Sequence, residues 1–114
     1  DNIMNEDVKN KIQEIIKSNE VVLFMKGSPD FPQCGFSANV VGLLNHFNIE
    51  YKSYDVLKDE SLRQGVKEFS KWPTIPQIYI KNEFIGGCDI INELASSGEL
   101  QEILVDKNIK HNIK

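Results

Sequence analysis

The sequence predicts an α/β domain with a small four-stranded mixed sheet flanked by helices on both faces. Three observations lead to this fold class. Hydrophobic patterns of helical and strand period alternate along the chain, a strand–helix–strand unit comes first, and a β-hairpin with further helices follows. A strand–helix–strand unit continued by a hairpin gives a mixed sheet whose two faces are both covered. The 114 residues are expected to form one domain, 1–114, with its core at about 8–104.

The first half of the chain is expected to fold as helix, strand, helix and strand. Apolar residues recur at helical spacing over 8–16, and the unbroken β-branched and aromatic run 21–25 indicates a buried strand. A proline-containing loop, 28–33, leads into a second helix over 36–47, because apolar residues again repeat there at helical spacing. Residues 51–56 are predicted to be a short second strand.

A third, shorter helix is expected over 62–69. Either Asp59 or Ser61 is its N-cap, since both side chains can accept a hydrogen bond from the first turn. The Trp72-Pro73 pair ends this helix, because a residue before proline is pushed out of the helical region.

The last part of the chain is predicted to be a hairpin and two helices. Residues 77–85 are expected to form two strands joined by a turn. Asp89 is expected to cap the next helix, and Gly98 to end it before a last helix over 100–104. The tail 107–114 is expected to fray, as chain ends commonly do.

Composition and charge exclude several classes of protein. The chain has 13 Lys and Arg against 17 Asp and Glu, and the net charge of −4 argues against nucleic acid and membrane surfaces as partners. The longest unbroken apolar run, 21–25, is far shorter than the roughly 20 residues of a membrane-spanning helix. The polar beginning of the chain lacks the apolar stretch of a signal peptide, so we expect no secretory leader within this sequence, while a targeting segment upstream of it stays open.

The cysteine count narrows the class further. Two cysteines, Cys34 and Cys88, do not make the disulfide framework of a small secreted domain. They also cannot complete a four-ligand zinc site, because His46 and His111 do not stand at ligand spacing from them. We expect reduced thiols in an intracellular compartment, either cytosol or mitochondrion, and chemistry that uses one thiol at a time or borrows ligands.

Cys34 is the candidate reactive thiol. It follows a proline-containing loop and precedes a predicted helix, where the helix dipole and free backbone N–H groups stabilise a thiolate. Lys26, at the end of the preceding strand, supplies a nearby positive charge. We therefore predict a pKa below the free value of roughly 8.5, and favour a reactive cysteine over a buried, inert one.

Four short motifs stand in order along most of the chain. They are Lys26, Cys-Gly-Phe-Ser at 34–37, Trp-Pro-Thr-Ile-Pro at 72–76 and Gly-Gly-Cys-Asp at 86–89. In this order and spacing they resemble the CGFS-type monothiol glutaredoxins, above all the single-domain members that serve iron–sulfur assembly. The resemblance implies a thioredoxin-like fold, in agreement with the element order above.

Ser37 occupies the place of the second cysteine in the Cys-x-x-Cys motif of thioredoxin-like redox proteins. A serine has no thiol with which to resolve a mixed disulfide at Cys34, so a two-cysteine cycle within the motif is excluded. Monothiol exchange with glutathione and metal ligation remain. Cys88 is either a remote resolving thiol or a small core residue beside the sheet.

The resemblance implies a glutathione site around the reactive cysteine. In the family, the sulfur of glutathione lies beside that cysteine, and a cis-proline turn pairs with the peptide backbone. The residues that the resemblance assigns to glutathione are Lys26, Cys34, Phe36, Arg63, Lys67, Thr74, Ile75, Pro76, Gly87, Cys88 and Asp89.

Elementary chemistry matches parts of glutathione to some of these residues. Backbone N–H groups at the helix start 87–89 suit the γ-glutamyl carboxylate, and Asp89 caps its helix, accepts from the ligand's ammonium, or does both. Lys26 and Arg63 supply positive charge for the glycine-end carboxylate, which suits the planar fork of an arginine. For Lys67 two alternatives stay open: it supplies positive charge in the same way, or it lies on a solvated face of its helix.

The resemblance also implies an iron–sulfur cofactor. A [2Fe–2S] cluster takes four ligands, and one chain supplies one exposed thiolate, Cys34, so two protomers and two glutathiones would complete the set. The family thus implies a homodimer bridged by the cluster, a monomer without it, and transfer of the cluster to acceptor proteins. Phe36 and Trp72 either shield the cluster or belong to the core.

Two functions from different classes stay open. One is a carrier of iron–sulfur clusters, and the other is a glutathione-dependent oxidoreductase that removes glutathione from protein mixed disulfides. The loop 29–33 and the single-cysteine motif resemble the carrier type, so we expect at most weak oxidoreductase activity. A third, plainer alternative is an inert interaction module with the thioredoxin fold.

Overall fold

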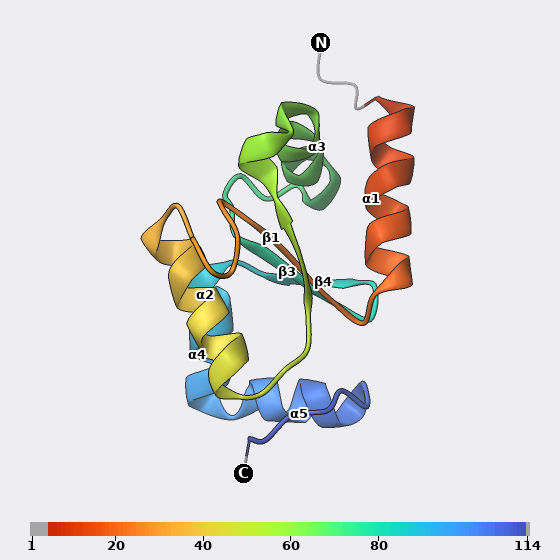
Figure 1. Cartoon of the computed structure of the whole chain (residues 1–114). Helices are drawn as coiled ribbons and strands as arrows, with labels where there is room; N and C mark the ends of the chain where they lie inside the picture. Colours follow the sequence, from red (N-terminus) through yellow and green to blue (C-terminus); the bar gives the residue numbers. More distant parts are fainter. Residues whose placement is uncertain (1–4, 114) are drawn as a thin grey trace.

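A computed structural model describes residues 5–113 and shows the elements in the expected order (Figure 1). Within these residues, no helix combines the length and the apolar character needed to cross a bilayer. The elements are α1 (Glu6–Ser18), β1 (Val21–Met25), α2 (Gly35–His46), β2 (Lys52–Asp55), the 3₁₀ helix η1 (Val56–Lys58), α3 (Glu60–Ser70), β3 (Gln77–Ile80), β4 (Glu83–Gly86), α4 (Cys88–Ser97) and α5 (Glu99–Asp106).

The strands form one mixed sheet in the order β2-β1-β3-β4, which confirms the predicted fold class. β1 runs parallel to β2 and antiparallel to β3, and β3 pairs antiparallel with β4. β1 is therefore a central strand, in which Leu23 stands opposite Ser53 on one side and Ile78 on the other. Every residue of β1 is buried, as its unbroken apolar run predicts.

Alternation along β1 divides the core into two layers. Val21, Leu23 and Met25 belong to the cluster covered by α2, α4 and α5. Val22 and Phe24 belong to the cluster covered by α1 and α3, because successive side chains of a strand point to opposite faces. Figure 1 shows the same division of the helices between the two sides of the sheet. Helices therefore cover both faces, as predicted.

The N-cap of α3 is one of the two residues expected, whereas the N-cap of α4 differs from the expected one. Asp59 rather than Ser61 caps α3, since its Oδ1 accepts from the N–H of Leu62 at 3.1 Å. Asp89 does not cap α4, whose N-cap is Gly87, with no side-chain hydrogen bond at that position. The helix thus starts earlier than expected, at Cys88. Asp89 lies in the first turn, where the helix dipole still favours its charge.

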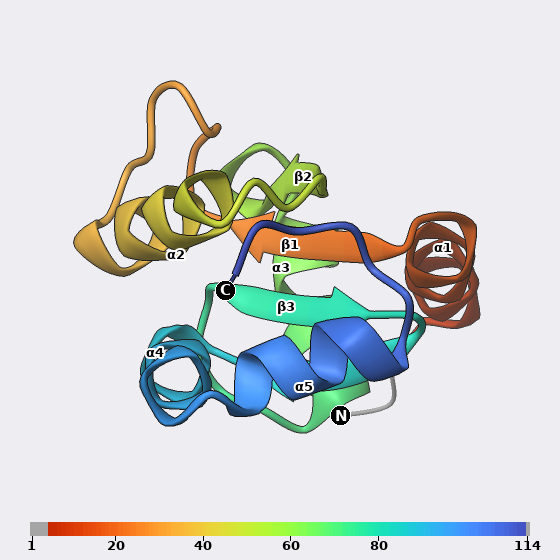
Figure 2. The same ribbon diagram turned by 90° about the horizontal axis from the view of Figure 1, so that it is seen from below.

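Residues 107–113 do not fray as expected but pack against the core, and Lys114 of the expected frayed tail lies outside the described residues. Ile109 is only 6% exposed and belongs to the cluster on the α2, α4 and α5 side. The N–H of Asn112 donates to the carbonyl of Phe47 at 2.9 Å, and the amide of Gln101 donates to the carbonyl of Ile113 at 3.2 Å. Figure 2 shows this dark blue segment turning back from the end of α5. Burial of its apolar side chains supplies the free energy that orders this chain end.

The second strand is shorter than expected, and a 3₁₀ helix that the sequence analysis did not predict follows it. β2 ends at Asp55, whose Oδ1 accepts from the N–H of Leu57 at 2.9 Å and so begins η1. Such short helical pieces have no hydrophobic period of their own, so a pattern search does not detect them.

Candidate functional site

Cys34 is the N-cap of α2, at the end of the loop that follows β1. Its Sγ accepts a hydrogen bond from the N–H of Ser37 at 3.4 Å and lies 3.5 Å from the Ser37 hydroxyl. The thiol is partly exposed and free of any disulfide. The structure therefore supports a reactive cysteine at a helix N-terminus over a buried, inert one.

Burial by itself raises the pKa of Cys34, but hydrogen bonds and charge outweigh it. The hydroxyl and N–H of Ser37 and the N–H of Phe36 stabilise the thiolate. The positive charge of Lys26 adds to them, so the pKa of Cys34 lies below its ordinary value, as predicted. The thiolate, which is the form that attacks disulfides and binds metals, is therefore more abundant at neutral pH.

Ser37 has a role that the sequence analysis missed. Its side chain is fully buried, and its Oγ accepts from the N–H of Lys26 at 3.1 Å while lying against Cys34. The hydroxyl thus joins the end of β1 to the first turn of α2. The Cys-Gly-Phe-Ser motif could have indicated this role, because it places the Ser37 hydroxyl one helical turn after the Cys34 thiol.

A groove of about 340 Å³ lies next to this helix start. The groove brings together nearly all the residues that the resemblance assigned to glutathione, although they come from distant parts of the chain. Of the assigned residues, Cys34 and Arg63 do not line it, although Phe36, two residues after Cys34, does. The lining residues are Lys26, Phe36, Lys67, Trp72, Pro73, Thr74, Ile75, Pro76, Gly87, Cys88, Asp89 and Ile90.

The loop before β3 forms one wall of the groove. Its Ile75–Pro76 peptide bond is cis, as the resemblance implied. The fully buried side chain of Gln77 supports the loop, because its Nε2 donates to the carbonyls of Trp72 and Thr74, each at 3.1 Å. Sequence analysis did not identify Gln77, whose hydrogen bonds go to backbone atoms that no motif marks.

Gly87 and Trp72 shape the end of the groove next to α4. A Cβ atom on Gly87 would lie 3.1 Å from the carbonyl oxygen of Pro76 and 3.4 Å from Nε1 of Trp72, so a side chain there would crowd this end of the groove. Within residues 5–113, the buried Nε1 of Trp72 has no hydrogen-bond partner. Trp72 therefore lines the groove and also packs against Phe84, with their ring centroids 5.8 Å apart.

The two cations of α3 are placed differently. Lys67 lines the groove. Arg63, one turn earlier, lies 3.6 Å from the carboxylate of Glu60 and does not line it. Its buried Nε finds no partner in the described part of the chain, so the guanidinium keeps a donor unused. The structure thus brings Lys67, but not Arg63, into the groove.

Cys88 lies in the groove at the start of α4. Its Sγ is 3.4 Å from Oδ1 of Asn39 and 3.4 Å from Nδ2 of Asn92. Burial, followed by the negative charges of Asp89 and Cys34, raises the pKa of this thiol. The two cysteines are therefore unequal, and Cys34 is the more readily ionised of the pair.

A reactive thiol before α2, with a cis-proline loop beside it and this order of strands, is the arrangement of thioredoxin-fold thiol proteins. Within that class, residues 21–85 match the family model Glutaredoxin, and the chain belongs to the glutaredoxin family.

The relatives of the chain are monothiol glutaredoxins, as the motifs predicted. An uncharacterized monothiol glutaredoxin of Synechocystis sp. is 52% identical over 101 residues, which cover 89% of this chain and 94% of the relative. Monothiol glutaredoxin-5, mitochondrial, of Saccharomyces cerevisiae is 52% identical over 86% of this chain and 67% of its own length. The solution structure of a monomeric truncated mutant of Trypanosoma brucei 1-C-Grx1 is 44% identical, with a TM-score of 0.85 over 93% of this chain and 96% of that one.

Proposed function

We propose that this chain binds glutathione in the groove beside Cys34, and that two copies share a [2Fe–2S] cluster and carry it to acceptor proteins. The observation that carries the proposal is the thiol of lowered pKa at Cys34, two residues before the groove-lining Phe36. The same groove holds the positive charges of Lys26 and Lys67 and the Nε1 donor of Trp72, which is unpaired within residues 5–113. Both cysteines are free, which suits a reducing compartment such as the cytosol or the mitochondrion.

The groove suits a small peptide with two carboxylates and one ammonium. Lys26 and Lys67 supply positive charge for one carboxylate. The first turn of α4 offers backbone N–H groups for the other, and Asp89, which caps no helix, remains available for the ammonium. Gly87 leaves the approach open, and beside it lies Nε1 of Trp72, a donor without a partner in the described part of the chain.

The other assigned residues fit the same ligand. Phe36 and Cys88 line the groove near the two helix starts, and Thr74, Ile75 and Pro76 form its loop wall. An extended peptide can pair with such a loop as an added strand. Arg63 would join them once its pair with Glu60 breaks, because it precedes the groove-lining Lys67 by one turn of α3 and its Nε has no partner within residues 5–113.

The cluster is the cargo of the protein, and its ligands are inferred from the number of thiolates that each chain and each glutathione can supply. Within residues 5–113, no group of three or more His, Cys, Asp or Glu side chains gathers as a metal site. Cys34 supplies one thiolate for each chain, and a [2Fe–2S] cluster takes four ligands. Two chains and two glutathione thiolates complete this number, so the proposed holo form is a homodimer and the apo form a monomer. Small diffusible ligands keep such a cluster transferable.

A second function is favoured by the lowered pKa of Cys34. The Cys34 thiolate attacks the glutathione sulfur of a protein mixed disulfide, the protein thiolate leaves, and Cys34 becomes glutathionylated. A second glutathione thiolate then attacks this mixed disulfide, which forms glutathione disulfide and restores the Cys34 thiolate. One free glutathione is consumed and one glutathione disulfide forms for each protein thiol released, so no further reductant is needed.

Anaerobic reconstitution with iron, sulfide and glutathione tests the proposal. The expected product is a brown protein with visible cluster absorbance and twice the apo mass in solution. Cys34→Ser should remain colourless, because it removes the proposed ligand. Cys88→Ser is the matched control, since it removes the other thiol and keeps the backbone of α4, and it should colour like the native chain.

Two outcomes would contradict the carrier function. A colourless native protein that rapidly reduces glutathionylated substrates would establish the oxidoreductase instead. A colourless protein without that activity would leave an interaction module with the thioredoxin fold.

A further inference from the structure

We propose that Asp55 is the positioning residue that holds Lys26 at the groove, and that it thereby sets the affinity of the site for the carboxylate of a bound peptide. The inference rests on the proposed glutathione function. It concerns a side chain that does not line the groove and that no motif of the sequence marks.

The backbone turns sharply at Lys26 and Gly27, and this Lys26 corner is tightly enclosed. Gly27 follows Lys26 with a φ of +88°, a conformation that favours glycine, and it is buried. A Cβ atom there would lie 2.5 Å from the carbonyl oxygen of Phe31 and 2.7 Å from the backbone nitrogen of Gln33. A side chain on Gly27 therefore does not fit at this corner, and the polar backbone groups of the corner must find partners inside that space.

Three hydrogen bonds fix this corner. The N–H of Lys26 donates to Oγ of Ser37 at 3.1 Å, and its carbonyl accepts from the N–H of Gln33 at 2.8 Å. Both partners belong to the loop and helix that carry the reactive thiol. The N–H of Gly27 donates to Oδ1 of Asp55 at 2.9 Å. Asp55 thus connects the Lys26 corner to the end of β2.

Asp55 is itself held in place. The same Oδ1 accepts from the N–H of Leu57 at 2.9 Å, so the carboxylate is fixed at the start of η1. Without it, the buried N–H of Gly27 would have no acceptor, and the corner would have to shift or admit water. Either change moves the backbone from which Lys26 reaches the groove.

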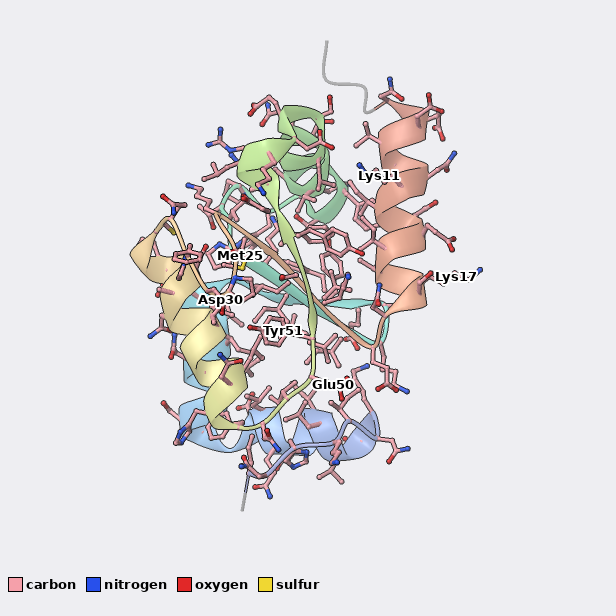
Figure 3. The ribbon with its side chains drawn as sticks, in the orientation of Figure 1. Lys11, Lys17, Met25, Asp30, Glu50 and Tyr51 are labelled. Atoms are coloured by element: carbon pink, nitrogen blue, oxygen red, sulfur yellow. The ribbon has the colours of Figure 1, made fainter. Side chains whose placement is uncertain are left out.

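Asp59 provides a matched control. It too caps a helix, since its Oδ1 accepts from the N–H of Leu62 at 3.1 Å. Its other oxygen lies 3.2 Å from Nζ of Lys11, which comes from α1 (Figure 3), and none of its hydrogen bonds goes to the Lys26 corner. Replacement of Asp59 therefore costs a cap without touching the groove.

Titration of the whole chain with reduced glutathione tests the inference. Asp55→Ala should raise the dissociation constant by about tenfold, as expected when a charged contact is misplaced. Asp55→Asn should bind within about twofold of the native chain, because its amide oxygen can still accept both N–H groups. Asp59→Ala should also bind within about twofold, although its melting temperature falls.

Amide hydrogen exchange at Gly27 is the second measurement. This amide should be protected in the native chain and in Asp55→Asn, and should exchange rapidly in Asp55→Ala. Native affinity in Asp55→Ala, or equal weakening in Asp59→Ala, would overturn the inference. If the native chain binds no glutathione, the proposed function fails, and unchanged Gly27 protection in Asp55→Ala would then overturn the inference separately.

Discussion

At the scale of single residues, Ser37 helps to activate the Cys34 thiol, although a serine cannot resolve a mixed disulfide formed there. Its hydroxyl and N–H both contact the sulfur of Cys34, and its Oγ also accepts from the backbone of Lys26. A second cysteine at this place would offer a competing nucleophile. A serine there stabilises the thiolate and leaves it without an internal partner, so that the sulfur stays available to outside groups.

Ser37→Ala is expected to raise the pKa of Cys34, because one donor to the thiolate is lost while the burial that opposes ionisation remains. At a given pH below the new midpoint, less thiolate is present, so the rate of alkylation by iodoacetamide falls and its pH profile moves to higher pH. The profile is measured in Cys88→Ser, so that one thiol reacts.

Ser28→Ala is the local control for this experiment. The Ser28 hydroxyl accepts from the N–H of Phe31 in the loop before α2, at 3.2 Å, and makes no hydrogen bond to Cys34. Its alkylation profile should match that of the parent protein. An unshifted profile in Ser37→Ala would show that the serine hydroxyl does not stabilise the thiolate.

At the scale of elements, the contact of α1 with α3 depends on a glycine. A Cβ atom on Gly65 would lie 2.4 Å from Cγ1 of Val8 and 3.2 Å from Cδ1 of Ile12. Gly65→Ala gains roughly 1 kcal/mol of helix propensity, but overpacking typically costs about 1–3 kcal/mol. We expect a net loss of up to about 2 kcal/mol in the free energy of unfolding, measured by urea denaturation.

Gly42→Ala should change stability in the opposite direction. Gly42 lies in α2, and a Cβ atom on it would meet nothing within 4 Å, so the alanine side chain enters open space. The expected gain is about 0.5–1 kcal/mol, from the helix propensity alone. If both alanine variants were stabilised equally, the close approach of α1 and α3 would not limit the residue at position 65.

The sequence predicts an element best where one physical signal decides it. β1 is a continuous apolar run, and its observed bounds are the predicted ones. The start of α4 is different, because both Gly87 and Asp89 can begin a helix and the choice depends on packing against the loop before β3. The tail was mispredicted for a related reason, since a short polar segment with isolated isoleucines shows no pattern until the core that receives them exists.

The sequence likewise predicts the candidate site only where a local motif marks a residue. Motifs placed the thiol, the cis-proline loop and the glycine beside α4, because each carries a local backbone requirement. The supports were missed, since Ser37, Gln77 and Asp55 act by hydrogen bonds to backbone groups that folding alone brings near. Arg63 was expected in the groove from its charge, but in the structure it pairs with Glu60 on its own helix.

At the scale of the whole molecule, the site and the stabilising tail lie at opposite ends of α2. Cys34 is the N-cap of this helix, and Phe47, which binds the tail through Asn112, is its C-cap. A helix of 12 residues is about 18 Å long, so the two ends are well separated. Stability gained at the tail should therefore be independent of ligand binding.

Ile109→Ala tests this separation. The side chain is 6% exposed, and truncation of a buried isoleucine typically costs about 2–4 kcal/mol. We expect that loss in urea denaturation, together with an unchanged affinity for glutathione under conditions where the variant is folded. Val105→Ala is the control, since Val105 is 61% exposed on neighbouring α5 and its truncation should change stability by less than about 0.5 kcal/mol. A loss of affinity in Ile109→Ala with the fold retained would show that the tail is coupled to the groove through α2, and equal stability of the two variants would show that the tail does not contribute to the core.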